Sequence, residues 1–533
     1  MVPRKKSSPL PTISLRYSHI TFKQLILKSI LSLIRYGFCA LPKVRKSLLV
    51  LLLVACAFTA KAQQNFVFSN NCKMAMEHYL NLELDAAMEV LSKEKFENPN
   101  NAMPYYLENY RDYLMLFIDE QKDDYDKLVD NKDQRLKKLE DADDSSPYYL
   151  FSQAEVHLQW SIARLKFKDY NTAFWEVRKA YRLLKKNQEK FPEFIPNYKS
   201  LGVIHALVGT LPDSFKWALK IMGINGNVGL GMQQLSAYKK VSKSENPFYE
   251  ENRLLYGFML VYINNDKTKA WQTVYQDGQL QQSPIWHFAA GNMAFRIGNN
   301  DKAIEILATS PKSATAHPFP FIEYMLGCTK LHRLDVTAVD NLLYYTSNHK
   351  GVHYVKEANQ KIAWYYLMND DEAQYRTYIK KCLTVGDNLM DADKYAQKEA
   401  ESGIMPNATL LKARLLFDGG YNQRAMEVLD LFEVEKCEVT EQKVEYYYRK
   451  ARIQQYLGNN EVAIVNYKQC IRLGSDLPLY FMPKSYILMG NYYEGVGKNE
   501  KAKEAYKKAT SYKNYEYKNS IDQQAKAGIN RIG

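Results

Sequence analysis

Apolar residues recur three and four positions apart along most of the chain, as they do on the buried face of an α-helix. Between these stretches a short pattern returns, in which a hydrophobic residue, a glycine and small polar residues precede an alanine. Its clearest copies are IGNNDKA (297–303), GGYNQRA (419–425), LGNNEVA (457–463) and VGKNEKA (496–502), and weaker copies are NLELDAA (81–87) and FKDYNTA (167–173). Glycine ends a helix in the left-handed conformation and asparagine caps the next one. The pattern therefore predicts an all-α chain of antiparallel helix pairs.

The alanines of this pattern are evenly spaced in the C-terminal part. Ala425, Ala463 and Ala502 lie 38 and 39 residues apart, and aromatic residues such as Tyr467 and Tyr506 follow at helical spacing. A period of this length is the signature of a helical solenoid, in which a small residue lets two helices approach closely. Further units centre on Ala87, Ala173, Ala270, Val339 and Ala373.

The segment YILMGNYYEGVGKNEKAKEAYKKA (486–509) is similar to a tetratricopeptide repeat (TPR). Tyr486, Met489, Gly490 and Tyr493 stand where the first TPR helix has an aromatic, a large apolar, a small and an aromatic residue. GNMAFRIGNNDKAIEIL (291–307) is nearly as close. The resemblance covers most of residues 70–515 and implies a TPR-like right-handed superhelical solenoid of antiparallel helix pairs. It implies protein partners in general, because TPR arrays bind many different proteins.

Residues 211–235, LPDSFKWALKIMGINGNVGLGMQQL, hold four glycines within nine positions. A dinucleotide-binding loop needs GxGxxG after a strand, whereas the order here is GxxGxG after a helical stretch. Alignment with residues 298–303 puts Gly231 in the alanine position, so we interpret the run as a turn between helices. The segment is also similar to the central part of the tetratricopeptide repeat protein 39 family and its fungal mitochondrial outer-membrane relatives, which implies a non-catalytic scaffold. The matching residues are Leu211, Pro212, Leu219, Gly223, Gly226, Gly229 and Leu230.

The formal net charge of +13 would suit a nucleic-acid partner, but its distribution does not. Residues 1–62 contain eleven Lys or Arg and no acidic residue, which leaves only +2 for the rest of the chain, so no nucleic acid is expected. The stretch KVRKSLLVLLLVACAFTAKAQ (43–63) has the basic start, short apolar core and Ala-x-Ala end of a secretory signal peptide. We therefore predict a leader over 1–62 with its signal peptide at 43–62. Two explanations of residues 1–42 are open. Either the start codon is assigned too early, or these residues form a long basic n-region of the signal peptide.

Two ways of processing the leader are open. Cleavage after Ala62 would release a soluble chain that begins at Gln63, whereas Leu53-Val54-Ala55-Cys56 resembles a lipobox in which Cys56 carries the lipid. The first predicts a periplasmic or envelope-associated protein, and the second an outer-membrane lipoprotein. Either way the membrane is reached only through the signal peptide or a lipid anchor.

The sequence offers little chemistry. It contains no HExxH, GxSxG or Walker motif, and the five cysteines after residue 62 include no CxxC pair. His349 and His353 are four positions apart and could bind a metal, but two surface histidines at a repeat joint are the favoured interpretation. We predict no catalytic residue, no cofactor and no metal. An enzyme with an unrecognised site is the alternative from another class.

Binding is better supported than catalysis. The first helix of each TPR pair lines a concave groove, and counting back from the repeat alanines gives the groove residues. Arginine offers a rigid fork for carboxylates and tyrosine a flat contact, so we predict an acidic or extended peptide as ligand. The carboxylate clamp of some TPRs wants lysine at the fifth position, where Ile487 stands, so that clamp is incomplete. The predicted groove residues are Arg414, Phe417, Tyr448, Arg452, Asn491 and Glu494.

The sequence thus predicts three parts: the leader (1–62), a divergent TPR-like array with the glycine-rich turn (63–400), and C-terminal TPRs with a capping helix (401–533). The predicted function is a non-catalytic TPR scaffold of the bacterial cell envelope that binds proteins or peptides in its groove. A lipid-anchored accessory protein of outer-membrane assembly or uptake is the nearest alternative.

Overall fold

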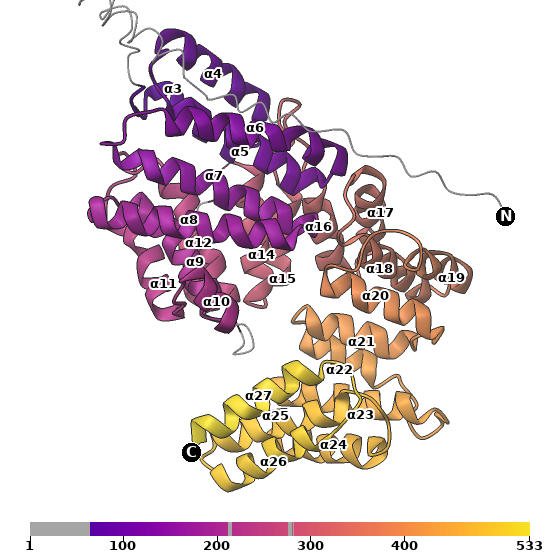
Figure 1. Ribbon diagram of the computed structural model, residues 1–533. Coiled ribbons are helices and arrows are strands. Elements are labelled where there is room, and N and C mark those ends of the chain that lie inside the picture. The colour runs from indigo at the N-terminus through magenta and orange to yellow at the C-terminus, as the bar shows by residue number, and fades with distance from the viewer. Residues whose placement is uncertain (1–63, 212–215, 276–279, 281, 533) are drawn as a thin grey trace, which may run out of the picture. The chain divides into compact units, whose positions relative to one another are not determined.

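Helices joined by short turns make up most of the described part of the computed structural model (Figure 1). The structure describes residues 64–211, 216–275, 280 and 282–532, so the predicted leader and Cys56 lie outside the described residues. The helices are α3 (Asn70–Leu80), α4 (Leu84–Glu97), α5 (Met103–Asp119), α6 (Lys122–Glu140), α7 (Pro147–Lys166), α8 (Tyr170–Lys190), α9 (Pro196–Val208), α10 (Lys216–Met222), α11 (Val228–Leu235), the 3-10 helix η3 (Ser236–Lys240), α12 (Tyr249–Tyr262), α13 (Lys267–Val274), α14 (Pro284–Arg296), α15 (Asn300–Ala308), α16 (Phe321–His332), α17 (Ala338–Asn348), α18 (Val355–Met368), α19 (Glu372–Lys381), α20 (Asp391–Ser402), α21 (Ala408–Asp418), α22 (Asn422–Leu429), α23 (Thr440–Tyr456), α24 (Asn460–Gly474), α25 (Phe481–Gly495), α26 (Asn499–Ser511) and α27 (Lys518–Ile532).

Neighbouring helices pack in pairs, and each pair packs on the next. The closest pairs are α7 with α8, α23 with α24 and α25 with α26, while α27 packs on both α26 and α25. Hydrophobic clusters follow one another along the chain and lie wholly within residues 64–533, which form one compact unit with its own core. The prediction of an all-α solenoid of antiparallel helix pairs is confirmed.

A left-handed residue stands directly before the N-cap residue of the second helix of these pairs. In the clear copies it is a glycine with φ between +71° and +87°, namely Gly298, Gly420, Gly458 and Gly497. In the weaker copies a non-glycine residue holds the same place with φ between +54° and +62°, namely Leu82, Lys168, Asn265 and Asp370. The turn geometry is therefore kept where the glycine is lost, which explains why those copies are hard to recognise in the sequence.

The predicted asparagine cap holds in one repeat and fails in another. The Asn299 side chain accepts a hydrogen bond from the backbone of Lys302 at the start of α15. The Asn459 side chain makes no such bond, because it donates instead to Gln454 of the preceding helix, at 2.7 Å. Backbone geometry at the glycine, more than the cap side chain, thus defines the turn.

The alanine position is a packing site in most of the repeats. Ala87, Ala270, Ala303 and Ala502 are fully buried at the fourth residue after their N-cap. The unit centred on Ala373 is an exception, because Ala373 is exposed. The buried residue at the corresponding place in α19 is Tyr375.

Replacing Gly458 by alanine is expected to lower the free energy of unfolding by about 1 kcal/mol, because the left-handed conformation is strained for a residue with a Cβ atom. No atom lies within 4 Å of the Cβ that would be added, so the effect measures backbone conformation alone. Gly495→Ala is the matched control: this glycine ends α25 without positive φ and is equally uncrowded. Its replacement should be neutral or stabilising in urea unfolding. Equal losses in the two variants would contradict the argument.

The glycine-rich segment places two helices in close contact. Gly223 ends α10 with φ +69°, and the Asn227 side chain caps α11. A Cβ on Gly231 would lie 2.5 Å from the backbone nitrogen of Ala206, and one on Gly226 equally close to the backbone of Gly209. These glycines let α9 and α11 pack backbone to backbone, which is a structural use of the run.

Buried ionic groups fill part of the interior between α6 and α12. The Lys199 ammonium is 2% exposed and lies 2.6 Å from a Glu155 oxygen and 2.9 Å from a Glu251 oxygen. Beside it, Glu176 binds the Lys132 ammonium at 2.6 Å and contacts the Nδ1 atom of His157. Such groups are retained in an interior only when each charge has a partner.

Contacts of long sequence separation tie the end of α5 to the segment before α18. Glu120 lies 2.8 Å from His353 Nδ1, pairs with Lys166, and accepts backbone hydrogen bonds from Val352 and His353. We call this set, with His349, the Glu120 clamp. Burial opposes ionisation, but His349, His353 and Lys166 together hold the pKa of Glu120 well below its usual range. The expectation of surface histidines is therefore wrong: both rings are buried, against a residue more than two hundred positions earlier in the chain.

Candidate peptide-binding groove

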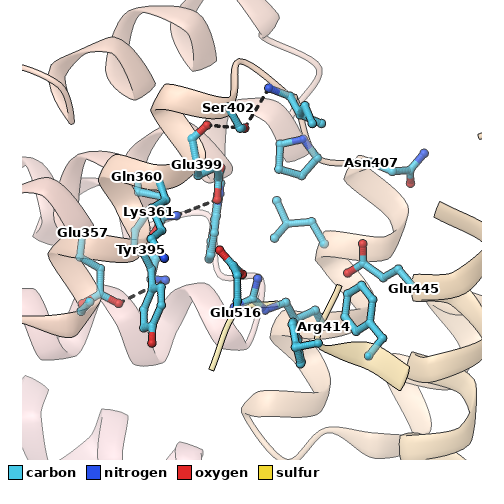
Figure 2. Close-up of a pocket in the computed structure, with 18 of the residues that line it drawn as sticks. Glu357, Gln360, Lys361, Tyr395, Glu399, Ser402, Asn407, Arg414, Glu445 and Glu516 are labelled. Atoms are coloured by element: carbon cyan, nitrogen blue, oxygen red, sulfur yellow. Dashed lines mark hydrogen bonds and ion pairs between the residues drawn. The ribbon is translucent and has the colours of Figure 1, made fainter. Parts of the chain in front are cut away.

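A cavity of about 400 Å³ opens among α18, α20, α21, α23, α25 and the segment before α27 (Figure 2). Trp364, one of its lining residues, is buried, and its ring centre lies 3.9 Å from the Lys361 ammonium and 5.1 Å from the Arg414 guanidinium. The indole nitrogen donates to Glu399 at 2.8 Å, and Gln360 donates to the same carboxyl at 2.7 Å. Burial raises the pKa of Glu399. This cavity, which we call the mixed pocket, is lined by aromatic side chains and by side chains of both signs of charge.

A second cavity of about 260 Å³ lies on the other side of Arg414 and shares Arg414, Arg449, Tyr480 and Tyr517 with the first. It is lined by four cationic side chains and one carboxylate, and we call it the basic pocket. The charged residues are Arg414, Arg449, Arg452, Lys484 and Asp418. Because the two pockets share four lining residues, they lie next to each other.

The positive charge of the basic pocket is only partly neutralised. Asp418 lies 3.7 Å from the Arg414 guanidinium, and Arg449 pairs with Glu445 at 2.8 Å. Among the described residues neither Arg452 nor Lys484 has an ion-pair partner; Lys484 donates to the neutral amide of Gln524 at 2.6 Å. Burial, together with the charge of Arg452, lowers the pKa of Lys484 to about 8. An anionic group entering the pocket would relieve this repulsion.

Arg414, Tyr448 and Arg452, three of the predicted groove residues, come together in the basic pocket. The Tyr448 ring is buried, and its hydroxyl accepts from Arg452 at 3.2 Å. Phe417 is also buried, with the Arg452 guanidinium 4.6 Å from its ring centre. The two aromatic rings therefore support Arg452, and they present little of their own surface to a ligand.

Asn491 and Glu494, the other two predicted groove residues, line neither pocket. The Tyr506 hydroxyl lies 2.8 Å from Asn491 Oδ1 and 2.6 Å from Glu494 Oε2. Glu494 also binds Arg531 of α27 at 2.7 Å. These two side chains hold the last helices together.

Sequence reasoning missed several residues of the site. Asn407, Glu445 and Lys484 line the pockets from a common place, eighteen residues before Ala425, Ala463 and Ala502, so the same count back from these alanines would have found them. Trp364 and Glu399 gave no such signal, because they lie on helices whose repeat register the sequence does not show, and Tyr517 lies before α27, beyond the last repeat alanine.

The family model for the tetratricopeptide repeat matches residues 444–474 and 483–515, which span most of α23 to α26. No curated protein matches the chain. The C-terminal part therefore contains tetratricopeptide repeats, and Tyr448, Arg452 and Lys484 lie within the matched segments. Repeats of this kind are protein-interaction modules and point to protein partners in general.

Proposed function

We propose that the protein is a non-catalytic scaffold that holds an extended, acidic segment of a partner protein across the basic and mixed pockets. The observation that carries this proposal is the pair of cations, Arg452 and Lys484, that lack an ionic partner among the described residues. Both side chains are half-buried, and an acidic side chain or the carboxylate of a chain terminus would supply the missing counter-charge.

The neighbouring mixed pocket suits the rest of such a segment. Its exposed lining residues Ile404 and Tyr517 can cover an apolar or aromatic side chain. A partner segment with acidic residues at one end and an apolar residue at the other would thus place its acidic end in the basic pocket and its apolar end in the mixed pocket.

The cell envelope is the proposed location. The basic, apolar and Ala-x-Ala parts of residues 43–62 support export, and the lipobox at Cys56 offers a lipid anchor as the alternative form. The resemblance of residues 211–230 to the tetratricopeptide repeat protein 39 family supports a scaffold role in either form.

The proposal is tested with Arg452→Ala/Lys484→Ala in residues 64–533. A labelled peptide with three acidic residues before one tryptophan should bind the wild type, and the double variant should lose on the order of tenfold to a hundredfold in affinity by fluorescence anisotropy. Raised salt should weaken binding in the wild type more than in the variant.

Lys468→Ala/Arg472→Ala is the matched control, since it removes two exposed cations of α24 that line neither pocket. This control should bind as the wild type does. Equal affinity of all three proteins, or equal binding of a peptide with glutamine in place of the acids, would refute the proposed site. If the double variant does lose affinity, cross-linking from envelope extract, with that variant as background, would identify the partner protein.

A further inference from the structure

The outer face of α8 is a basic and aromatic ridge. Trp175 is 53% exposed, with the Arg178 guanidinium 5.3 Å from its ring centre, and Lys179, Arg182 and Lys186 follow along the exposed side. These side chains flank a surface depression whose described lining comes from this helix alone. Among the charged residues of that lining none is acidic. We call this face the α8 ridge.

The neighbouring helix α10 adds exposed apolar groups. Its Leu219 side chain packs on the core cluster that includes Tyr181 and Leu184 of α8, and the backbone of Asn225, just after α10, lies against the Tyr181 hydroxyl. On the outward side, Trp217 is 67% exposed and Ile221 48% exposed. An exposed tryptophan and isoleucine one helical turn apart have no structural use within the described part of the chain.

We infer that the α8 ridge and α10 together form a docking surface for a membrane that carries anionic phospholipids. Charge complementarity favours a polyanionic partner, since Arg178, Lys179, Arg182 and Lys186 face outward together. The exposed apolar groups favour a membrane over other polyanionic partners. Tryptophan and isoleucine side chains can insert below the headgroups of a bilayer, whereas a nucleic-acid backbone or an acidic peptide would contact only the charged side chains.

The described lining of the depression on the ridge comes from α8, whereas several helices supply the described lining of the mixed pocket. No helix among the described residues is long and apolar enough to cross a membrane, so the contact is one that lies on the bilayer. This surface would bring the groove and its client to a membrane without any lipid on the protein itself.

The test uses residues 64–533, which contain their own core and exclude the basic leader that would itself bind lipid. Vesicles of equimolar phosphatidylglycerol and phosphatidylcholine should pull down this protein in sedimentation, and vesicles of phosphatidylcholine alone should not. Lys179→Ala/Arg182→Ala/Lys186→Ala should reduce partition on the order of tenfold to a hundredfold. Trp217→Ala/Ile221→Ala should reduce it about tenfold, even though it removes no charge.

Lys498→Ala/Lys501→Ala/Lys507→Ala removes three exposed lysines of α26 and its N-cap, and it should bind vesicles like the wild type. Circular dichroism would establish that every variant is folded. Equal loss in this control would show a response to net charge and would overturn the docking surface. So would binding that the Trp217 and Ile221 changes leave intact while soluble polyglutamate competes for it, because the surface would then be one for acidic protein segments.

Discussion

Lys199→Met is expected to lower the free energy of unfolding by about 3–5 kcal/mol, the usual cost of removing one partner from a buried ion pair. Methionine fills the space of the lysine stem between the Phe151 and Phe248 rings, so the loss reports on charge more than on packing. The Glu155 carboxylate is left buried without its counter-ion. Burial already raises the pKa of Glu155 in spite of Lys199.

The pH dependence gives this prediction a second readout. A carboxyl group whose pKa is higher in the folded than in the unfolded state makes the fold less stable as the pH rises from the unfolded-state pKa to the folded-state pKa. The reason is that the unfolded chain releases the proton more easily. The defect of Lys199→Met should therefore be larger at about pH 8 than at about pH 5. Urea unfolding at the two pH values measures it.

Two further variants serve as controls for Lys199→Met. Glu155→Gln/Lys199→Met removes both charges of the pair and should recover most of the loss, since Glu251 keeps a hydrogen bond from Tyr110 at 2.9 Å. Lys394→Met breaks an exposed pair with Asp391 and should change stability little. Equal losses of stability in Lys199→Met and Lys394→Met would contradict the claim that burial makes the ion pairs of Lys199 costly to break.

Glu176 is expected to make the fold acid-sensitive. Burial works against its ionised form, but His157 and Lys132 bind the carboxylate and lower the pKa of Glu176 to about 2. A carboxyl with a lowered folded-state pKa contributes stability above its unfolded pKa of about 4.3 and loses it as the pH falls toward 2. From these two values the contribution is about 3 kcal/mol.

The Glu176→Gln variant should show this directly. At neutral pH it loses about 3 kcal/mol, because Lys132 and Arg164 keep buried charges beside a neutral amide. Between pH 5 and pH 2 its stability should fall less steeply than that of the wild type, by urea unfolding. Burial also lowers the pKa of His157, so that ring resists protonation in the folded state. In both proteins this adds a further decrease of stability as the pH falls. Parallel pH curves for wild type and variant would contradict the assignment.

Local sequence signals were enough for the fold where the repeat kept its glycine. Gly298, Gly458 and Gly497 predicted turns that the structure contains, because glycine and the left-handed conformation go together. At Lys168 the same conformation falls on a residue that does not favour it, so FKDYNTA (167–173) gave only a weak copy of the pattern. The Ala373 assignment failed for a related reason, since Tyr375 holds the buried place.

The candidate site was predictable to the extent that it follows the repeat register. Arg414 and Arg452 could be counted back from repeat alanines, and Lys484 could have been, whereas Trp364 and Glu399 belong to α18 and α20, which pack with one another outside the regular alternation. The buried state of His349 and His353 depends on Glu120, which is distant in the sequence. Periodicity in a sequence describes neighbours along the array and carries no information about such contacts.

The Glu120 clamp has a consequence for how many helices the chain can hold. An open repeat array can gain or lose a helix pair, because each repeat touches only its neighbours. Here the hydrogen bond from His353 to Glu120 closes a loop of 233 residues, and the ion pair between Lys168 and Asp387 spans a similar length. Inserting or deleting a pair within that loop would move one side of the clamp away from the other. The number of helices between α5 and α18 is therefore fixed by closure, much as the number of strands is fixed in a closed barrel.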